Sequence, residues 1–164
     1  STLALYSVPL LDDNNGWVVG YNGILFGTTD GGDHWSLLHS PADPAVTPFL
    51  GNNCHNIISL SATELFGING KVIRSVDGGL SWANDGADMP GSSMLFARSA
   101  NEWFCALEGA ANTSGCNMGH STDGGKTWSK FNPAGVIMPI RKIFSYGTDV
   151  YAFASDMQIV KYNN

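Results

Sequence analysis

One eight-residue pattern occurs three times in this chain at a nearly constant spacing, and it restricts the possible folds more than any other feature. Each copy has a Ser or Thr, any residue, Asp-Gly-Gly, two further residues and a Trp. The tryptophans Trp35, Trp82 and Trp128 are 47 and then 46 residues apart. A period of this size indicates repeated supersecondary units that bury their faces against their neighbours. We therefore expect a repeat protein.

Each residue type in the pattern suits a tight turn followed by a strand. Asp, Ser and Thr side chains hydrogen-bond to nearby backbone and fix the turn. Glycine supplies the positive φ that such a turn requires, and the Trp carries a large apolar surface into the space between units. We expect structural roles at nine positions: Asp30, Gly32, Trp35, Asp77, Gly79, Trp82, Asp123, Gly125 and Trp128.

The three copies resemble the Asp-box of sialidases and related β-propellers. In that family the box turns the chain from the third to the fourth strand of a blade, on the rim and remote from ligands. The resemblance implies an all-β propeller of four-stranded antiparallel blades. Residues 10–23, which read Leu-Leu-Asp-Asp-Asn-Asn-Gly-Trp-Val-Val-Gly-Tyr-Asn-Gly before the first box, further resemble the repeat of photosystem II assembly/stability factors.

Alignment on the boxes divides a single domain, 1–164, into three complete blades and an incomplete fourth. The blades cover about residues 5–39, 55–84, 94–131 and 141–164. The second strand of each blade is expected to open on a repeated apolar residue, namely Trp17, Leu65, Trp103 and Val150. The final Tyr-Asn-Asn occupies the place of a Ser-x-Asp triplet, so no fourth strand is expected in the last blade.

Composition narrows the class of partner. Only 13% of the residues are charged and the net charge is -6, which disfavours binding to nucleic acid. Twenty glycines and 11% aromatic residues suit an all-β chain with many turns. The longest apolar runs, such as 136–140, are too short to span a bilayer, so no membrane insertion is expected.

The three cysteines bear on the compartment. Cys105 and Cys116 flank the tip of an expected hairpin, and opposite positions of a hairpin can meet disulfide geometry. A bridge there would suit an oxidising compartment, and we expect an extracellular or periplasmic location. The alternative is a pair of small buried thiols.

The longest irregular segments predict where a ligand would bind. In propellers, the connections from the second to the third strand and from one blade to the next share the face that usually binds ligands. Here that face collects 39–53, 83–93, 108–115 and 132–139, and long loops on a repetitive scaffold are where function concentrates. The candidate binding residues are Phe49, Asn53, His55, Asp85, Asp88, Glu108, Asn112 and Asn132.

These features favour a non-catalytic interaction module with a protein partner and no cofactor. A glycan-binding lectin is the alternative, because repeated Trp, Asn and Asp suit sugar stacking and hydroxyl recognition. A sialidase-like hydrolase is the third interpretation, since the resemblance implies three arginines on a substrate carboxylate. The chain has Arg74, Arg98 and Arg141, but the Arg-Ile-Pro motif is absent and we assign no catalytic residue.

No metal site is expected. His39, Cys54 and His55 are suitable ligand types, but their spacing matches no known pattern. In addition, side chains of adjacent strand residues such as Cys54 and His55 point to opposite faces.

The incomplete fourth blade raises the question of ring closure. Blades 1 and 4 must either meet or expose apolar surface. We favour a homodimer in which two chains close a ring head to tail with two equivalent contacts. A closed four-bladed monomer and a fragment of a longer chain are the alternatives.

Overall fold

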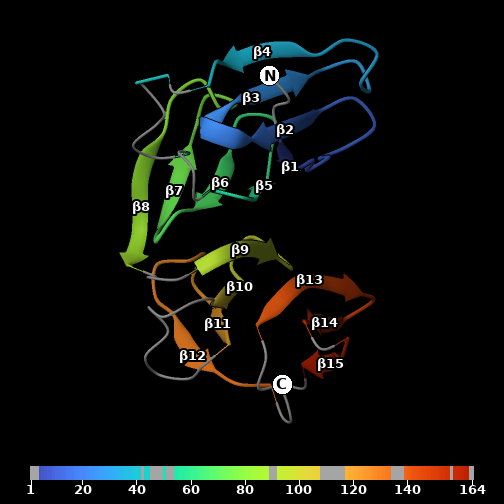
Figure 1. Ribbon diagram of the computed structural model, residues 1–164, viewed down its shortest axis with the longest axis vertical. Helices are drawn as coiled ribbons and strands as arrows, with labels where there is room; N and C mark the ends of the chain where they lie inside the picture. Colours follow the sequence, from blue (N-terminus) through green and yellow to red (C-terminus); the bar gives the residue numbers. More distant parts are fainter. Residues whose placement is uncertain are drawn as a thin grey trace.

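The computed structural model describes residues 4–41, 43–44, 50, 54–88, 92–107, 117–133, 139–155 and 157–162. In this part the chain forms four antiparallel sheets that follow one another along an arc (Figure 1). The predicted all-β propeller, with three complete blades and an incomplete fourth, is confirmed. None of the described helical segments is long and apolar enough to cross a membrane.

Each sheet is one blade, and its strands are adjacent in chain order. Blade 1 contains β1 (Leu5–Ser7), β2 (Gly16–Gly20), β3 (Leu25–Thr28) and β4 (Ser36–His39). Blade 2 contains β5 (Ile57–Ser59), β6 (Leu65–Ile68), β7 (Lys71–Ser75) and β8 (Ala83–Asp88). Blade 3 contains β9 (Ser92–Ala97), β10 (Trp103–Leu107), β11 (Met118–Ser121) and β12 (Ser129–Phe131). Blade 4 contains β13 (Ile140–Tyr146), β14 (Asp149–Ala154) and β15 (Ile159–Tyr162).

Two strand boundaries deserve a physical explanation. In blade 1, which was expected to begin near residue 5, β1 ends at Ser7, and beyond it only an isolated bridge joins Leu10 to Gly16. Pro9 explains the early end, because proline has no N–H to give to a ladder. The segment 83–93 was expected to be an irregular loop, yet its first six residues form β8.

The box turns have the predicted internal hydrogen bonds. In the second copy the Ser75 hydroxyl donates to Asp77 Oδ1 at 2.8 Å and accepts from the Gly79 N–H at 2.8 Å. Asp77 Oδ1 also accepts from the Ser81 N–H at 2.9 Å. The same bonds recur in the other two copies. Gly79 has a φ of 98°, which explains the need for glycine there.

Three apolar clusters join the four blades. Trp17 and Leu65 belong to the cluster between blades 1 and 2, whereas Phe66 and Trp103 belong to the one between blades 2 and 3. A third cluster joins Phe104 to residues of blade 4. Blade-to-blade burial is therefore the main source of the core, as expected for repeats.

The strand registers give the correct alignment of the repeats. Ser75 and Thr28 each begin an Asp-box and are therefore equivalent. Ser75 pairs with Leu65 on the neighbouring strand, whereas Thr28 pairs with Gly16 and not with Trp17. Trp17 is thus equivalent to Phe66, one position after Leu65. The expected equivalence of Trp17 with Leu65 is wrong, and because side chains alternate, this slip of one residue assigns Trp17 to the opposite face.

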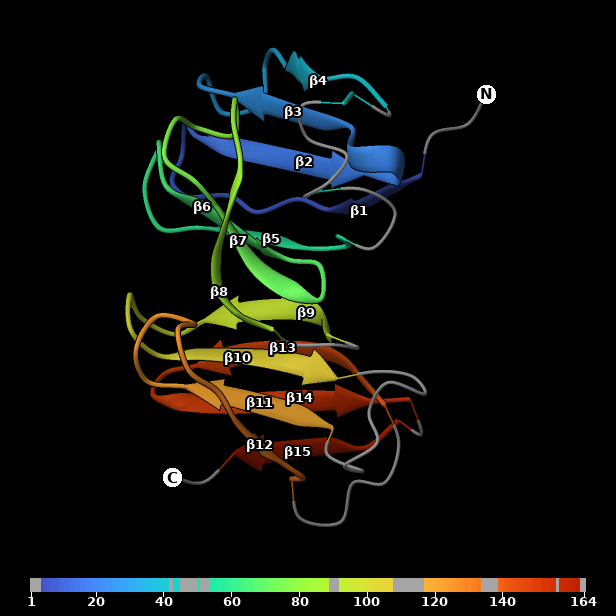
Figure 2. The same ribbon diagram turned by 90° about the vertical axis from the view of Figure 1, so that its left-hand side faces the viewer.

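The first strand of every blade lies nearest the centre of the arc (Figures 1 and 2). These inner strands are β1, β5, β9 and β13. Blades 1 and 4 form the two ends of the arc, and no apolar cluster among the described residues joins them. No blade among the described residues covers their outward faces.

Candidate functional site: the axial cavity

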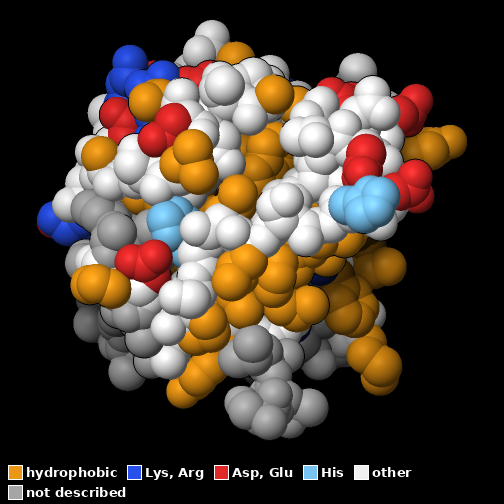
Figure 3. Space-filling model, turned by 90° about the horizontal axis from the view of Figure 1, so that it is seen from above, with side chains coloured by type: hydrophobic (Ala, Val, Ile, Leu, Met, Phe, Trp, Pro, Cys, Tyr) orange, Lys and Arg blue, Asp and Glu red, His pale blue; other side chains and the backbone are white. Residues whose placement is uncertain are grey.

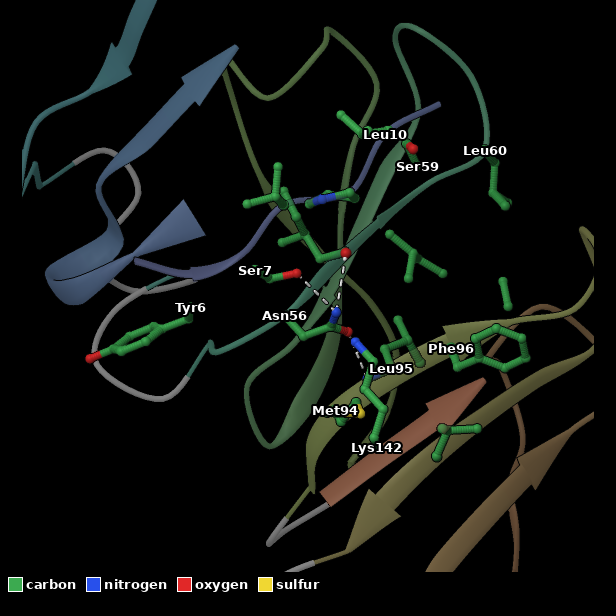
Figure 4. A pocket seen from close by; sticks show the side chains of 16 residues that line it. Tyr6, Ser7, Leu10, Asn56, Ser59, Leu60, Met94, Leu95, Phe96 and Lys142 are labelled. Atoms are coloured by element: carbon green, nitrogen blue, oxygen red, sulfur yellow. Dashed lines mark hydrogen bonds between the residues drawn. The ribbon is translucent and has the colours of Figure 1, made fainter. Parts of the chain in front are cut away.

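A cavity of about 470 Å³ lies on the axis of the arc, bordered by all four inner strands. Residues 6–10 of the β1 segment, 56–60 of the β5 segment, 94–97 of β9 and two residues of β13 line it. In Figure 4 the side chains of Ser7 and Asn56 meet and Lys142 extends towards them, whereas Tyr6 points away. A site on the axis is lined by one segment from each repeat, so a ligand bound there would contact all four blades.

Asn56 ties three blades together at this cavity. Its Nδ2 donates to Ser7 Oγ in blade 1 at 3.2 Å, and its Oδ1 accepts from the Leu95 N–H in blade 3 at 2.9 Å. Nδ2 is also 3.4 Å from the carbonyl oxygen of Ile57. The amide therefore fixes the spacing of the first three inner strands, and it adds polar surface to the cavity.

The cavity wall combines apolar surface with one positive charge. Leu10, Leu60 and Phe96 contribute apolar side chains from three different blades. Lys142 extends from β13 towards Asn56 (Figure 4) and is the charged residue among those that line the cavity. Within the described residues, no ion pair holds its ammonium group. Such a wall suits a ligand with apolar groups and a carboxylate.

The three arginines are not arranged to bind one substrate carboxylate. Arg74 pairs with Glu64 and lies 3.8 Å from Asp85, and its guanidinium covers the Phe66 ring. Arg98 pairs with Glu102, while Arg141 donates to Ser155 Oγ at 2.8 Å. They belong to three blades and have separate partners, so they stabilise the scaffold where they lie.

The candidate binding residues do not form one site in the described structure. Asp85 and Asp88 lie on β8 rather than on a loop, and Asp88 pairs with Lys71 at 3.0 Å. Asn132 accepts a hydrogen bond from the Asn117 N–H at 2.7 Å, beyond β12. His55 is adjacent to the axial cavity, where its ring contacts the ring of Tyr6 at 4.7 Å. Phe49, Asn53, Glu108 and Asn112 lie outside the described residues.

Cys105 forms no disulfide among the described residues, where the register of β10 and β11 pairs it with Gly119. Cys105 is a free, buried thiol, and Cys116 lies outside the described residues. Burial raises the pKa of the Cys105 thiol to about 12, as it does for Cys54. Cys105 therefore behaves as a small core residue, while the pairing of Cys105 with Cys116 stays a prediction.

The described residues contain no group of three or more His, Cys, Asp or Glu side chains arranged to hold a metal ion. Cys54 is buried between blades 1 and 2, whereas the neighbouring His55 is exposed. The two side chains thus lie in different surroundings, and both residues precede β5 rather than lying in a strand.

Sequence reasoning missed the inner-strand residues, of which Ser7, Asn56 and Lys142 are the polar ones that matter most. Loop length was the criterion for a binding site, and these residues lie beside apolar strands rather than in long loops. The useful signal was Asn56 itself, because an Asn directly before Ile57 and Ile58 has to satisfy its amide in an apolar setting.

Comparison with known proteins bears out the resemblance seen in the sequence. The chain is 30% identical, over 105 residues, to the photosystem II assembly lipoprotein Ycf48 of Synechococcus sp. (strain CC9902). A solved structure of YCF48 bound to D1 peptide superposes with a TM-score of 0.63 at 21% identity, and YCF48 from Cyanidioschyzon merolae with 0.64 at 20%. The chain is similar to Ycf48 in sequence and in fold. No protein-family model matches it.

The shares of chain covered differ greatly between these proteins. The Synechococcus match covers 62% of this chain and 29% of the relative, and the two YCF48 structures cover 94% and 98% of this chain but 49% and 53% of theirs. The chain thus spans about half of the solved YCF48 chains. The computationally designed Ika4 protein is of similar extent, with 99% of this chain and 92% of that chain covered at a TM-score of 0.60 and 11% identity.

Proposed function

We propose that the chain is a non-catalytic protein-binding propeller that holds an extended peptide segment of its partner in the axial cavity. The cavity carries the proposal, because it gathers one strand from each blade around a wall of mixed polar and apolar groups with a single ammonium group. The similarity to Ycf48, one structure of which holds a D1 peptide, supports a peptide as the ligand class. Lys142 favours segments that carry a carboxylate.

A peptide-binding assay tests the site. A labelled D1 peptide and a panel of apolar peptides, each with and without one acidic residue, are titrated against the purified chain. We expect acidic members to bind at least tenfold more tightly, and Lys142→Glu to remove that preference. Lys126→Glu is the matched control, since Lys126 is exposed in the box turn of blade 3. Equal binding of acidic and neutral peptides, or an unchanged preference in Lys142→Glu, contradicts the proposed site.

The glycan-binding alternative gains no support from the comparisons. The same assay with a glycan array separates the two classes of ligand, and retention of a sugar without any peptide binding would favour the lectin.

The proposed location is outside the cytoplasm, in an extracellular or periplasmic space. The name of the Synechococcus relative, a lipoprotein, supports export. Fractionation of the native host with an antibody against the chain tests this, and recovery with cytoplasmic markers would contradict it.

The proposed partners include a second copy of this chain that completes the ring around the axial cavity. Support comes from the exposed apolar side chains on the outward faces of blades 1 and 4, such as Leu37 and Ile159.

A further inference from the structure

The three box tryptophans show which face of blade 1 lacks a neighbour. Trp82 of blade 2 is 6% exposed, within the cluster shared with blade 1, and Trp128 of blade 3 packs against the cluster shared with blade 2. Each box Trp therefore packs towards the preceding blade. Trp35 has no preceding blade in the described structure and is 38% exposed.

The rest of this face of blade 1 is apolar. Phe26 pairs with Leu37, which is 54% exposed, and Leu10 bridges to Gly16 and is 68% exposed. Leu5, which pairs with Gly20, is also exposed on this side. Figure 3 looks at the molecule from the blade 1 end and shows hydrophobic side chains gathered there, with acidic groups around them. We call this surface the blade 1 face.

The opposite end of the arc has the residues that normally face a following blade. Trp17, Phe66 and Phe104 occupy one repeat position, and each packs against the next blade. The register of β14 and β15 puts Tyr151 at the same position in blade 4. An aromatic residue is thus present at this position even where no described blade follows.

Other side chains of this end are strongly apolar. Phe144 pairs with Tyr151, and their rings stack 5.5 Å apart. Tyr146 is 82% exposed and Ile159 is 63% exposed. We call this surface the blade 4 face. The register puts the ion pair of Lys161 with Asp149, 2.7 Å long, on the same face. Exposed apolar side chains gathered on one face favour an interaction site.

The charges of the two end blades are complementary. Residues 4–44, which include blade 1, contain five acidic residues and no Lys or Arg. Residues 139–162, which include blade 4, contain three basic and two acidic residues. Complementary charge of this kind favours contact between unlike ends and disfavours contact between like ends.

We propose that the blade 4 face of one chain binds the blade 1 face of a second copy, and that the reciprocal contact closes a ring of two chains. This rests on the homodimer included in the proposed function and specifies its surfaces. The contact repeats the three blade-to-blade interfaces already present, with Tyr151 and Ile159 of one copy facing the side of the other that holds Trp35. In the closed ring, residues of both copies would line the axial cavity.

The first test is the mass of the purified chain by light scattering as a function of concentration. We expect the mass of two chains, falling towards that of one on dilution, with a dissociation constant that rises at high salt. Leu37→Lys and Ile159→Asp each place a charge of the wrong sign on one face and should each raise the dissociation constant at least tenfold. Val76→Lys and Leu80→Asp are matched controls, because both side chains are exposed on the box turn of blade 2.

Mixing the two variants tests the head-to-tail arrangement. Each variant alone has lost both contacts of the ring, but a mixture of Leu37→Lys with Ile159→Asp retains one unaltered blade 1 face and one unaltered blade 4 face. We expect the mixture to recover the mass of two chains. A wild-type chain that is monomeric at all concentrations, or a mixture that remains monomeric, overturns the proposal.

Other occupants of the faces give different results. If the faces bind like to like, one variant alone remains dimeric, which also overturns head-to-tail docking. If they are covered by further blades of a longer natural chain, the present chain is monomeric and a longer product is found in the host. Peptide binding is measured separately, so a monomer that still binds peptide overturns the docking proposal alone.

Discussion

The first and second Asp-boxes have almost the same internal structure but very different surroundings. In both, the Ser or Thr hydroxyl and the Asp carboxylate make the same turn bonds, with lengths that agree within 0.2 Å. Yet Trp82 is 6% exposed and Trp35 is 38% exposed. The motif therefore fixes the turn and the direction of the Trp, whereas burial comes from the preceding blade.

Hydrogen bonds across the interface between blades 1 and 2 also distinguish the second box from the first. The Trp17 indole N–H donates to the Gly78 carbonyl at 3.0 Å, and His39 Nε2 hydrogen-bonds with the Gly79 carbonyl at 2.9 Å. Both groups extend from blade 1 onto the second box. A Cβ at position 79 would lie 2.8 Å from Leu25 of blade 1, while the atoms nearest to one at position 32 would be those of the Trp35 ring in the same box. The second box therefore packs against the preceding blade and accepts hydrogen bonds from it.

The largest expected effect is the difference in stability between variants at Trp82 and at Trp35. Trp82→Ala should lower the free energy of unfolding by about 3–5 kcal/mol, because it removes a large side chain from the blade 1–blade 2 core. Trp35→Ala should cost about 1 kcal/mol in dilute protein, since its ring already contacts water. Urea unfolding measures both. Equal losses would show that the turn, and not the preceding blade, determines the contribution of the Trp.

The architecture could be predicted because the box is local. Its Asp, Gly and Trp each act within one turn, so three copies at one period gave the number of complete blades and the absence of a box in the fourth. The sequence does not show which face of its sheet each strand residue occupies. Trp17 and Leu65 are both apolar residues at the start of a strand. Only their partners, Gly27 for Trp17 and Ser75 for Leu65, show that they differ by one repeat position.

The candidate site could not be predicted because it depends on contacts between distant segments. Asn56 acquires its role from Ser7 and from the backbone of Leu95, which are 49 and 39 residues away. Lys142 is notable only because the three preceding inner strands bring no charge to the cavity. Local patterns contain neither fact. Conversely, the predicted loop residue Asp88 lies on a strand that pairs with Lys71, since β8 continues past the expected blade end.

An intermediate effect tests the part of the box that is common to all copies. Asp77→Ala should lower the free energy of unfolding by about 1–3 kcal/mol, because the Ser81 N–H and hydroxyl lose their acceptor. Asp33→Ala is the matched control: Asp33 is exposed in the turn of the first box and has no hydrogen bond among the described residues. Calorimetry or urea unfolding measures both. Peptide binding by folded Asp77→Ala should be unchanged, and its loss with normal stability would contradict a structural role.

The smallest expected effect is the acid sensitivity of the exposed boxes. Hydrogen bonds from the His34 N–H, the His34 ring and the Thr28 hydroxyl lower the pKa of Asp30 to about 2. The Thr127 hydroxyl, the Thr127 N–H and the Ser121 hydroxyl likewise lower the pKa of Asp123 to about 2. Both start from an ordinary value of 3.8. A carboxyl whose pKa is lower in the folded state stabilises the fold above the unfolded pKa, and this contribution is lost as the pH falls through the folded pKa.

The two carboxylates should therefore contribute fully above about pH 4, and progressively less as the pH falls from there towards 2. Asn retains one acceptor oxygen but does not titrate, so Asp30→Asn with Asp123→Asn should be less stable than wild type at pH 6 and should lose less stability between pH 4 and 2. Urea midpoints at several pH values measure this. Because both groups are exposed, the contribution of each should be small, and it should be alike in the first and third boxes although only the third has a preceding blade. Parallel pH profiles for wild type and the double variant would show that these bonds do not stabilise the charged form, and the turn would then hold through its glycines and hydroxyls alone.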